Sequence, residues 1–250
     1  MSDAAPTHAV TTPTATIPHL LKLLNTTSAP IQILVQREEQ SKTFYVHAAV
    51  LTQTSKFFQN AMKPEWRSDP NKPIELHDTC SSDFEAYSQW LYTRLLPSED
   101  SYRRFSALSG LYVLGERLMD DTFQQIIIDH MILRAGNTGA KLDRCPALET
   151  INIIYKGTST NSPARRLVSD MWAHGALNPT FNLLSQLDPE RDGELMRDML
   201  QTLAKYHPMT TLGRPLPWQT QRERYRCDYV EQVDGDDRLA KKPKLDRQTS

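Results

Sequence analysis

Phe44-Tyr45-Val46-His47-Ala48-Ala49-Val50-Leu51 is followed, three residues later, by Ser55-Lys56-Phe57-Phe58. Up to His47 the residues are aromatic or β-branched, which is typical of a strand. From Ala48 onward the apolar residues recur three and four positions apart, as they do on one face of a helix. An earlier apolar segment, 31–36, is separated from this stretch by polar residues. We therefore predict a β-hairpin followed by two short helices.

Downstream of the hairpin the pattern is mostly helical. Prolines interrupt residues 64–73 and exclude a regular helix there, and 74–77 is short enough to be a single strand. The run Ser81-Ser82-Asp83 has the side-chain acceptors typical of a helix N-cap. Further amphipathic helices are predicted over 102–118 and from Asp120-Asp121 to about residue 134. Strands that cluster early and helices that come late favour an α+β domain over residues 17–134.

The second half of the chain carries only helical signals. A helix is predicted over 146–156, and three pairs, Ser162-Pro163, Asn178-Pro179 and Asp188-Pro189, each combine an N-cap acceptor with a proline suited to the first helical position. We therefore expect an all-α extension over 141–212. The ends lack a core-forming pattern, so 1–16 is predicted to be a flexible N-terminal segment and 213–250 a largely disordered polar tail.

Composition excludes several classes of protein. The chain of 250 residues has 29 Lys plus Arg against 30 Asp plus Glu, so no overall positive charge exists to attract nucleic acid or anionic lipid. Its three cysteines are too far apart for a C-x-x-C site or a disulfide framework. The start has no signal-peptide pattern, and no stretch approaches a membrane span. We expect an intracellular protein of the nucleus, the cytoplasm or both, with no membrane or direct nucleic-acid partner.

No motif in the sequence supports catalysis. Gly110 and Gly115 have the glycine spacing of a P-loop, but Glu116-Arg117 follow in place of Lys-Ser/Thr, and the segment falls inside a predicted helix. The seven histidines are scattered, so no metal site is predicted. His47 invites a catalytic interpretation, yet a histidine between a strand and a helix is better placed to hydrogen-bond the backbone. We expect no catalytic residues, no metal and no cofactor.

The motifs of residues 43–96 resemble the BTB/POZ domain, particularly its stand-alone fungal type. The resemblance rests on F-x-V-H at 44–47, V-L at 50–51, S-x-F-F at 55–58, I-x-L at 74–76, Phe84, and W-L-Y-T at 90–93. It extends more weakly over 31–134. The resemblance implies a small β-sheet flanked by a cluster of helices. It also implies a non-enzymatic protein–protein interaction module that mediates homo- or hetero-oligomerisation and recruits partners.

Two alternative functions follow from the same resemblance. One is a substrate adaptor of a cullin-based ubiquitin ligase. However, Pro64 stands where cullin-binding members often have Glu, so the sequence provides no support for a cullin partner. The other is a nuclear transcription cofactor. A basic cluster preceded by Arg238 fits the short nuclear-import pattern, although a solvated basic tail would look the same. The cluster consists of Lys241, Lys242 and Lys244.

Candidate interface residues follow from family members that exchange N-terminal elements between two subunits. An amphipathic helix over 17–24 either packs on its own domain or reaches a partner subunit, and the sequence does not distinguish the two. The first strand and the segment after the second short helix complete the set. The candidates are Ile17, Leu20, Leu21, Leu24, Ile31, Met62 and Trp66. The expected partners are therefore proteins, a second copy of this chain among them.

Overall fold

The sheet begins with an antiparallel hairpin. β1 (Pro30–Arg37) and β2 (Gln40–His47) pair along their whole length, from Pro30 opposite His47 to Arg37 opposite Gln40. Glu38, in the two-residue turn between them, has a φ of 54°. β3 (Ile74–Leu76) pairs with β1 in parallel, so the order in the sheet is β2-β1-β3. The hairpin and the short third strand are as the hydrophobic pattern predicts.

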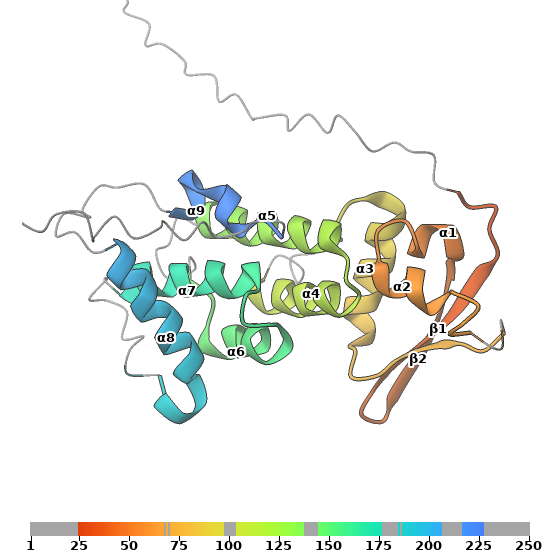
Figure 1. Ribbon diagram of the computed structural model, residues 1–250, viewed down its shortest axis with the longest axis horizontal. Coiled ribbons are helices and arrows are strands. Elements are labelled where there is room, and N and C mark those ends of the chain that lie inside the picture. Colours follow the sequence, from red (N-terminus) through yellow and green to blue (C-terminus); the bar gives the residue numbers. More distant parts are fainter. Residues whose placement is uncertain are drawn as a thin grey trace, which may run out of the picture.

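The structure is a computed structural model that describes residues 25–67, 69, 71–97, 104–137, 145–176, 185, 187–206 and 217–227. Figure 1 shows the sheet at one end of the molecule and the helix α8 (Pro189–Tyr206) at the other, with α4 (Phe105–Arg117), α5 (Asp121–Asn137) and α6 (Leu148–Gly157) between them. No helix in the described part of the chain is both long and apolar enough to cross a membrane.

Three helices lie next to the sheet. They are α1 (Ala48–Leu51), α2 (Lys56–Ala61) and α3 (Ser81–Thr93). The predicted N-cap of α3 is wrong in detail, because Ser81 is already helical and Cys80 occupies the N-cap position without a side-chain hydrogen bond. Ser55 does cap α2, since its hydroxyl accepts from the Phe58 N–H at 3.2 Å. The same hydroxyl donates to the Leu118 carbonyl at 2.7 Å, which ties α2 to the end of α4 (Phe105–Arg117).

The remaining helices extend the molecule away from the sheet. α4 is followed by α5 (Asp121–Asn137), α6 (Leu148–Gly157) and α7 (Pro163–Ala176), then by α8. A short α9 (Pro217–Thr220) and the 3-10 turn η4 (Arg222–Tyr225) come last. The α+β fold with a helical extension is thereby confirmed.

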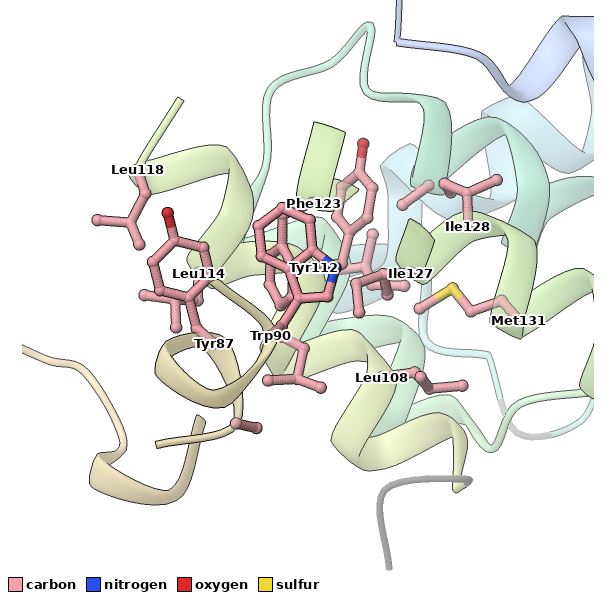
Figure 2. Close-up of a cluster of buried hydrophobic side chains, with 14 of the residues drawn as sticks. Tyr87, Trp90, Leu108, Tyr112, Leu114, Leu118, Phe123, Ile127, Ile128 and Met131 are labelled. Carbon is pink, nitrogen blue, oxygen red and sulfur yellow. The ribbon is translucent and has the colours of Figure 1, made fainter. Parts of the chain in front are cut away.

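One continuous core joins the sheet-containing part to the helical extension. Figure 2 shows side chains from α3, α4 and α5 meeting in a single cluster. The aromatic rings lie close: the centroids of Trp90 and Phe123 are 4.8 Å apart, as are those of Tyr87 and Phe123. The labelled members of this cluster are Tyr87, Trp90, Leu108, Tyr112, Leu114, Leu118, Phe123, Ile127, Ile128 and Met131. Phe123 belongs to α5, so the core around α3 is completed by the helix that comes after α4 in the chain.

Residues 217–227 differ from the polar tail that the sequence suggested. Trp218 and Tyr225 are both buried, and Trp218 meets the His174 ring edge-on at 5.5 Å. The Tyr225 hydroxyl donates to Asp170 of α7 at 2.6 Å, and Thr202 of α8 donates to the same carboxyl group at 2.9 Å. The segment therefore packs on α7, and its two aromatic residues belong to the core.

The buried side chain of Asp120, between α4 and α5, links three parts of the chain. Its Oδ1 accepts from the Phe123 N–H at 3.0 Å and so caps α5. Its Oδ2 accepts from the Thr54 hydroxyl at 2.5 Å and from the Tyr87 hydroxyl at 2.9 Å. Burial, with Asp120 alongside, holds the pKa of Tyr87 well above its usual value, so this hydroxyl remains a donor. All three donors lose their acceptor if Asp120 is removed.

We predict that Asp120→Ala lowers the free energy of unfolding by about 3–5 kcal/mol, because buried donors are left unsatisfied. The neighbouring Asp121 provides a matched control. It forms an exposed ion pair with Lys56 at 2.7 Å, and Asp121→Ala should cost less than about 1 kcal/mol. Urea denaturation of both variants measures the difference. Similar losses for the two variants would contradict the assigned role of Asp120.

Candidate interaction surfaces

The predicted interface residues differ in their positions in the structure. Four of them, Ile17, Leu20, Leu21 and Leu24, lie outside the described residues, as does the import cluster of Lys241, Lys242 and Lys244. Ile31 is a correction: only 8% of it is exposed, because it points from β1 into the core, so it offers no surface to a partner. Met62 is half-buried against the core. Trp66 is exposed.

Trp66 lies in a turn that follows α2. The Trp66 N–H donates to the Lys63 carbonyl at 3.0 Å, and the Arg67 N–H donates to the same carbonyl at 3.1 Å. Pro64 lies within this turn, and its ring cannot continue a regular helix. The turn leaves 79% of Trp66 exposed, more than any other large apolar residue in the described part of the chain.

Sequence reasoning missed two further exposed apolar residues near the sheet. Tyr45 is exposed on β2 because Phe44 and Val46 point inward, and the alternation of a strand turns the residue between them outward. This signal was present in the sequence. Leu95 is exposed because α3 ends at Arg94, whose φ is 59°. The Arg94 guanidinium lies 4.6 Å from the centre of the Trp90 ring.

His47 has a structural position at the end of β2. Its Nδ1 lies 2.8 Å from the Tyr92 hydroxyl, and its backbone N–H donates to that hydroxyl at 3.0 Å. The partner of the ring is thus a side chain of α3, where the sequence suggested a backbone group. The described residues contain no cluster of three His, Cys, Asp or Glu side chains that could hold a metal ion.

A groove of about 670 Å³ runs along the boundary between the sheet-containing part and the helical extension. We call it the junction groove. Four segments line it: the end of β1 with the turn that follows, the loop between β3 and α3 with the start of α3, one face of α4, and the second half of α6. Its lining residues are Arg37, Glu38, Asp78, Thr79, Cys80, Asp83, Gly110, Val113, Leu114, Arg117, Ile153, Lys156 and Gly157.

Two glycines allow the helices around the junction groove to approach closely. A Cβ atom on Gly157 would lie 2.5 Å from Cγ1 of Val113, so only glycine lets α6 pack this tightly on α4. A Cβ atom on Gly110 would lie 2.7 Å from Oδ2 of Asp83, at the start of α3. Gly110 lies inside α4, as does Gly115, which supports the interpretation of their P-loop-like spacing as a coincidence.

Both signs of charge surround the junction groove. Arg117 holds the loop before α3, because its guanidinium donates to the His77 carbonyl at 2.5 Å and to the Asp78 carbonyl at 2.9 Å. Burial raises the pKa of Asp83 to about 6, and the charge of Arg37 acts in the opposite direction. The groove continues into a second hollow of about 300 Å³ at the hairpin tip, which also includes Glu39.

A third hollow, of about 170 Å³, lies in the helical extension and is polar. Its charged side chains are bound to other side chains or to the backbone. Arg165, which is buried, donates to Glu194 at 2.5 Å and to the Tyr155 and Thr158 carbonyls at 2.5 Å. These bonds join α6, α7 and α8. We therefore interpret this hollow as part of the framework of the extension.

The close contact of α6 with α4 can be tested with two glycines. We predict that Gly157→Ala destabilises the protein by about 1–3 kcal/mol, because the added methyl group overlaps Val113. Gly193 of α8 has no atom within 4 Å of an added Cβ, so Gly193→Ala should stabilise by up to about 1 kcal/mol. Thermal unfolding of both variants checks the opposite signs. A neutral Gly157→Ala would mean that α6 is not packed as described.

Comparison with known proteins agrees with this geometry. Residues 23–118 match the family model described as the BTB/POZ domain, which is less than half of the chain. The match ends just after α4, so α5 and the later helices lie beyond it. No curated protein matches the sequence. The hairpin, the third strand and the helices α1 to α4 fall within the matched range, so the similarity to the BTB/POZ domain covers residues 23–118 and not the whole chain.

Proposed function

We propose that this chain is a non-enzymatic protein–protein interaction module whose BTB/POZ domain binds a second copy of the chain or recruits another protein. BTB/POZ domains are in general protein–protein interaction modules, which supports the coarse function. The observation that carries the finer proposal is the exposure of Trp66, 79% of which faces solvent.

An exposed tryptophan is a strong candidate for a binding contact. Tryptophan is enriched among the few residues that contribute most of the energy at protein interfaces, because it buries a large area at a small cost in conformational entropy. In this chain Trp66 is held by a hydrogen-bonded turn, and Met62 at the end of α2 is half-buried next to the core. A partner that covers Trp66 would therefore meet an ordered surface.

The outer edge of β2 is a weaker candidate for the interface. Among the described strands β2 pairs only with β1, so its other edge is open to strand addition. However, Lys42 lies on this strand and forms an exposed ion pair with Glu85 at 2.7 Å. Charged residues, lysine above all, are a common means of protecting an edge strand from pairing. We therefore place the principal contact at Trp66.

The two alternative functions are tested by other measurements. A cullin scaffold would meet the same turn, but Pro64 stands where the docking motif has Glu, so we favour self-association or another protein partner. Capture by a cullin amino-terminal domain would reverse that preference. A transcription cofactor requires nuclear import, and exclusion from the nucleus after changing Lys241, Lys242 and Lys244 to Ala would support it.

We predict that Trp66→Ala weakens association at least tenfold, because it removes the largest exposed apolar side chain of the described BTB/POZ domain. Leu200→Ala is the matched control, since 65% of Leu200 is exposed on α8, in the extension. Light scattering over a range of concentrations measures self-association. Affinity capture followed by mass spectrometry measures recruitment of other proteins.

Both variants are compared with the wild-type chain in both measurements. The proposal requires that Trp66→Ala reduces the molar mass or the set of captured proteins and that Leu200→Ala changes neither. If Trp66→Ala retains both the mass and the captured proteins of the wild type, the turn after α2 is not the interface.

A further inference from the structure

The junction groove and the hollow at the hairpin tip form one surface with two chemical halves. They share Glu38 and Asp78. In the hairpin hollow, Glu38, Glu39 and Asp78 contribute three carboxyl groups, and Lys and Arg are absent from its described lining. Further along the groove the lining combines an apolar part, formed by Val113 of α4 and a 41% exposed Ile153 of α6, with the cations Arg37, Arg117 and Lys156. A segment that fits both halves needs cationic and apolar residues close together.

This chain contains such a segment beyond its described residues. Residues 238–245 are Arg238-Leu239-Ala240-Lys241-Lys242-Pro243-Lys244-Leu245. Four of the eight are cationic, and Leu239, Ala240 and Leu245 are apolar. We propose that residues 238–245 dock in cis on this surface, with the lysines at the carboxyl groups of the hairpin hollow and the leucines on the apolar part of the junction groove.

The described chain ends close enough for this contact. Cys227 lines a hollow together with Glu116 of α4 and Ser159, which follows α6. Arg117 and Gly157 line the junction groove. Glu116 directly precedes Arg117 in the sequence, and Ser159 lies two residues after Gly157. Eleven residue steps lead from Cys227 to Arg238, and an extended chain of that length spans up to about 35 Å. The whole of α4, at about 1.5 Å per residue, is only about 20 Å long.

Tethering favours this occupant over a free peptide of the same composition. A segment joined by a short linker has an effective concentration of the order of millimolar at a site within its reach. Exposed ion pairs are individually weak, at about 0–1 kcal/mol, so such a contact depends on tethering and on the apolar residues. Docking would cover the cluster Lys241, Lys242 and Lys244, and any receptor of that cluster would have to compete with it. This inference does not depend on the Trp66 interface.

Zero-length carbodiimide crosslinking of the full-length protein tests the proposal, because it joins only lysines and carboxyl groups that are in contact. An equal mixture of unlabelled and ¹⁵N-labelled protein separates links within one copy from links between copies. We expect links from the tail lysines to Glu38, Glu39 or Asp78 within one copy, at least fivefold more abundant than links to Glu65 or Glu190. The last two are exposed carboxyl groups outside the groove.

A charge exchange provides a second, independent readout. Glu38→Lys with Glu39→Lys reverses the charge around Asp78 and should reduce the links of the tail lysines to Asp78 at least fivefold, and both substituted residues are exposed, so the fold should tolerate the change. Adding Lys241→Glu, Lys242→Glu and Lys244→Glu should restore links, now between carboxyl groups of the tail and the lysines introduced at positions 38 and 39. Glu190→Lys is the control and should leave the links unchanged. Links spread evenly over the control carboxyl groups, links only between copies, or a charge exchange without restoration would each overturn the proposal.

Discussion

The close packing of α4 against α3, α5 and α6 holds the sheet-containing part and the helical extension together. This helix of 13 residues contacts α3 on the side of the sheet, α5 along its length and α6 in the extension. Such contacts on several sides need small residues, and glycine at 110, 115 and 157 provides them. At Gly115 an added Cβ would lie 3.1 Å from the Phe123 ring, so α5 also approaches α4 closely. A helix packed in this way cannot move relative to one neighbour without disturbing the others.

The BTB/POZ match and the core therefore have different boundaries. The match ends at residue 118, but the rings of Tyr87 and Trp90 pack on Phe123 of α5, and Asp120 connects the start of α5 to Thr54 and Tyr87. Within the extension, the buried Asp170 of α7 accepts hydrogen bonds from Thr202 of α8 and from Tyr225, which ties both segments to α7. We infer that residues beyond the match are required for the stability of the BTB/POZ domain and are not an independent appendage. The junction groove lies where the two parts meet.

The sequence predicts the elements better than it predicts their contacts. Periodicity located the hairpin and the described helices because core-facing positions repeat at two or near 3.6 residues, whereas the third strand was predicted from its short length; the helix expected after Asn178-Pro179 falls on 177–184, outside the described residues. Asp120 was correctly placed at the start of a helix, but its bonds to Thr54 and Tyr87 join residues that are 66 and 33 positions apart. No local pattern contains that information. Ile31 shows the same limit, since an apolar strand residue can face either a partner or the core.

The C-terminal segment was misjudged for a related reason. Trp218 and Tyr225 stand among polar residues, so the segment around them lacks a core-forming pattern in the sequence. Only the contacts of these two residues with α7 reveal that they are buried. Of the two candidate surfaces, one was selected from the sequence and the other was not. Trp66 was chosen as a candidate through the resemblance to the BTB/POZ family, and the structure shows that it is exposed. The junction groove could not be chosen from the sequence, because its lining comes from four separate segments of the chain.

Because their cores are continuous, we expect residues 23–118 and the helical extension to unfold as one unit. Trp90 is buried in the first and Trp172 in the second, so each reports on one part. Fluorine NMR of protein labelled with 5-fluorotryptophan follows both resonances through a urea titration. We expect the native signals of Trp90 and Trp172 to disappear with the same midpoint, as coincident probes do in a two-state transition. Loss of the Trp172 signal while that of Trp90 persists would show that the two parts unfold separately.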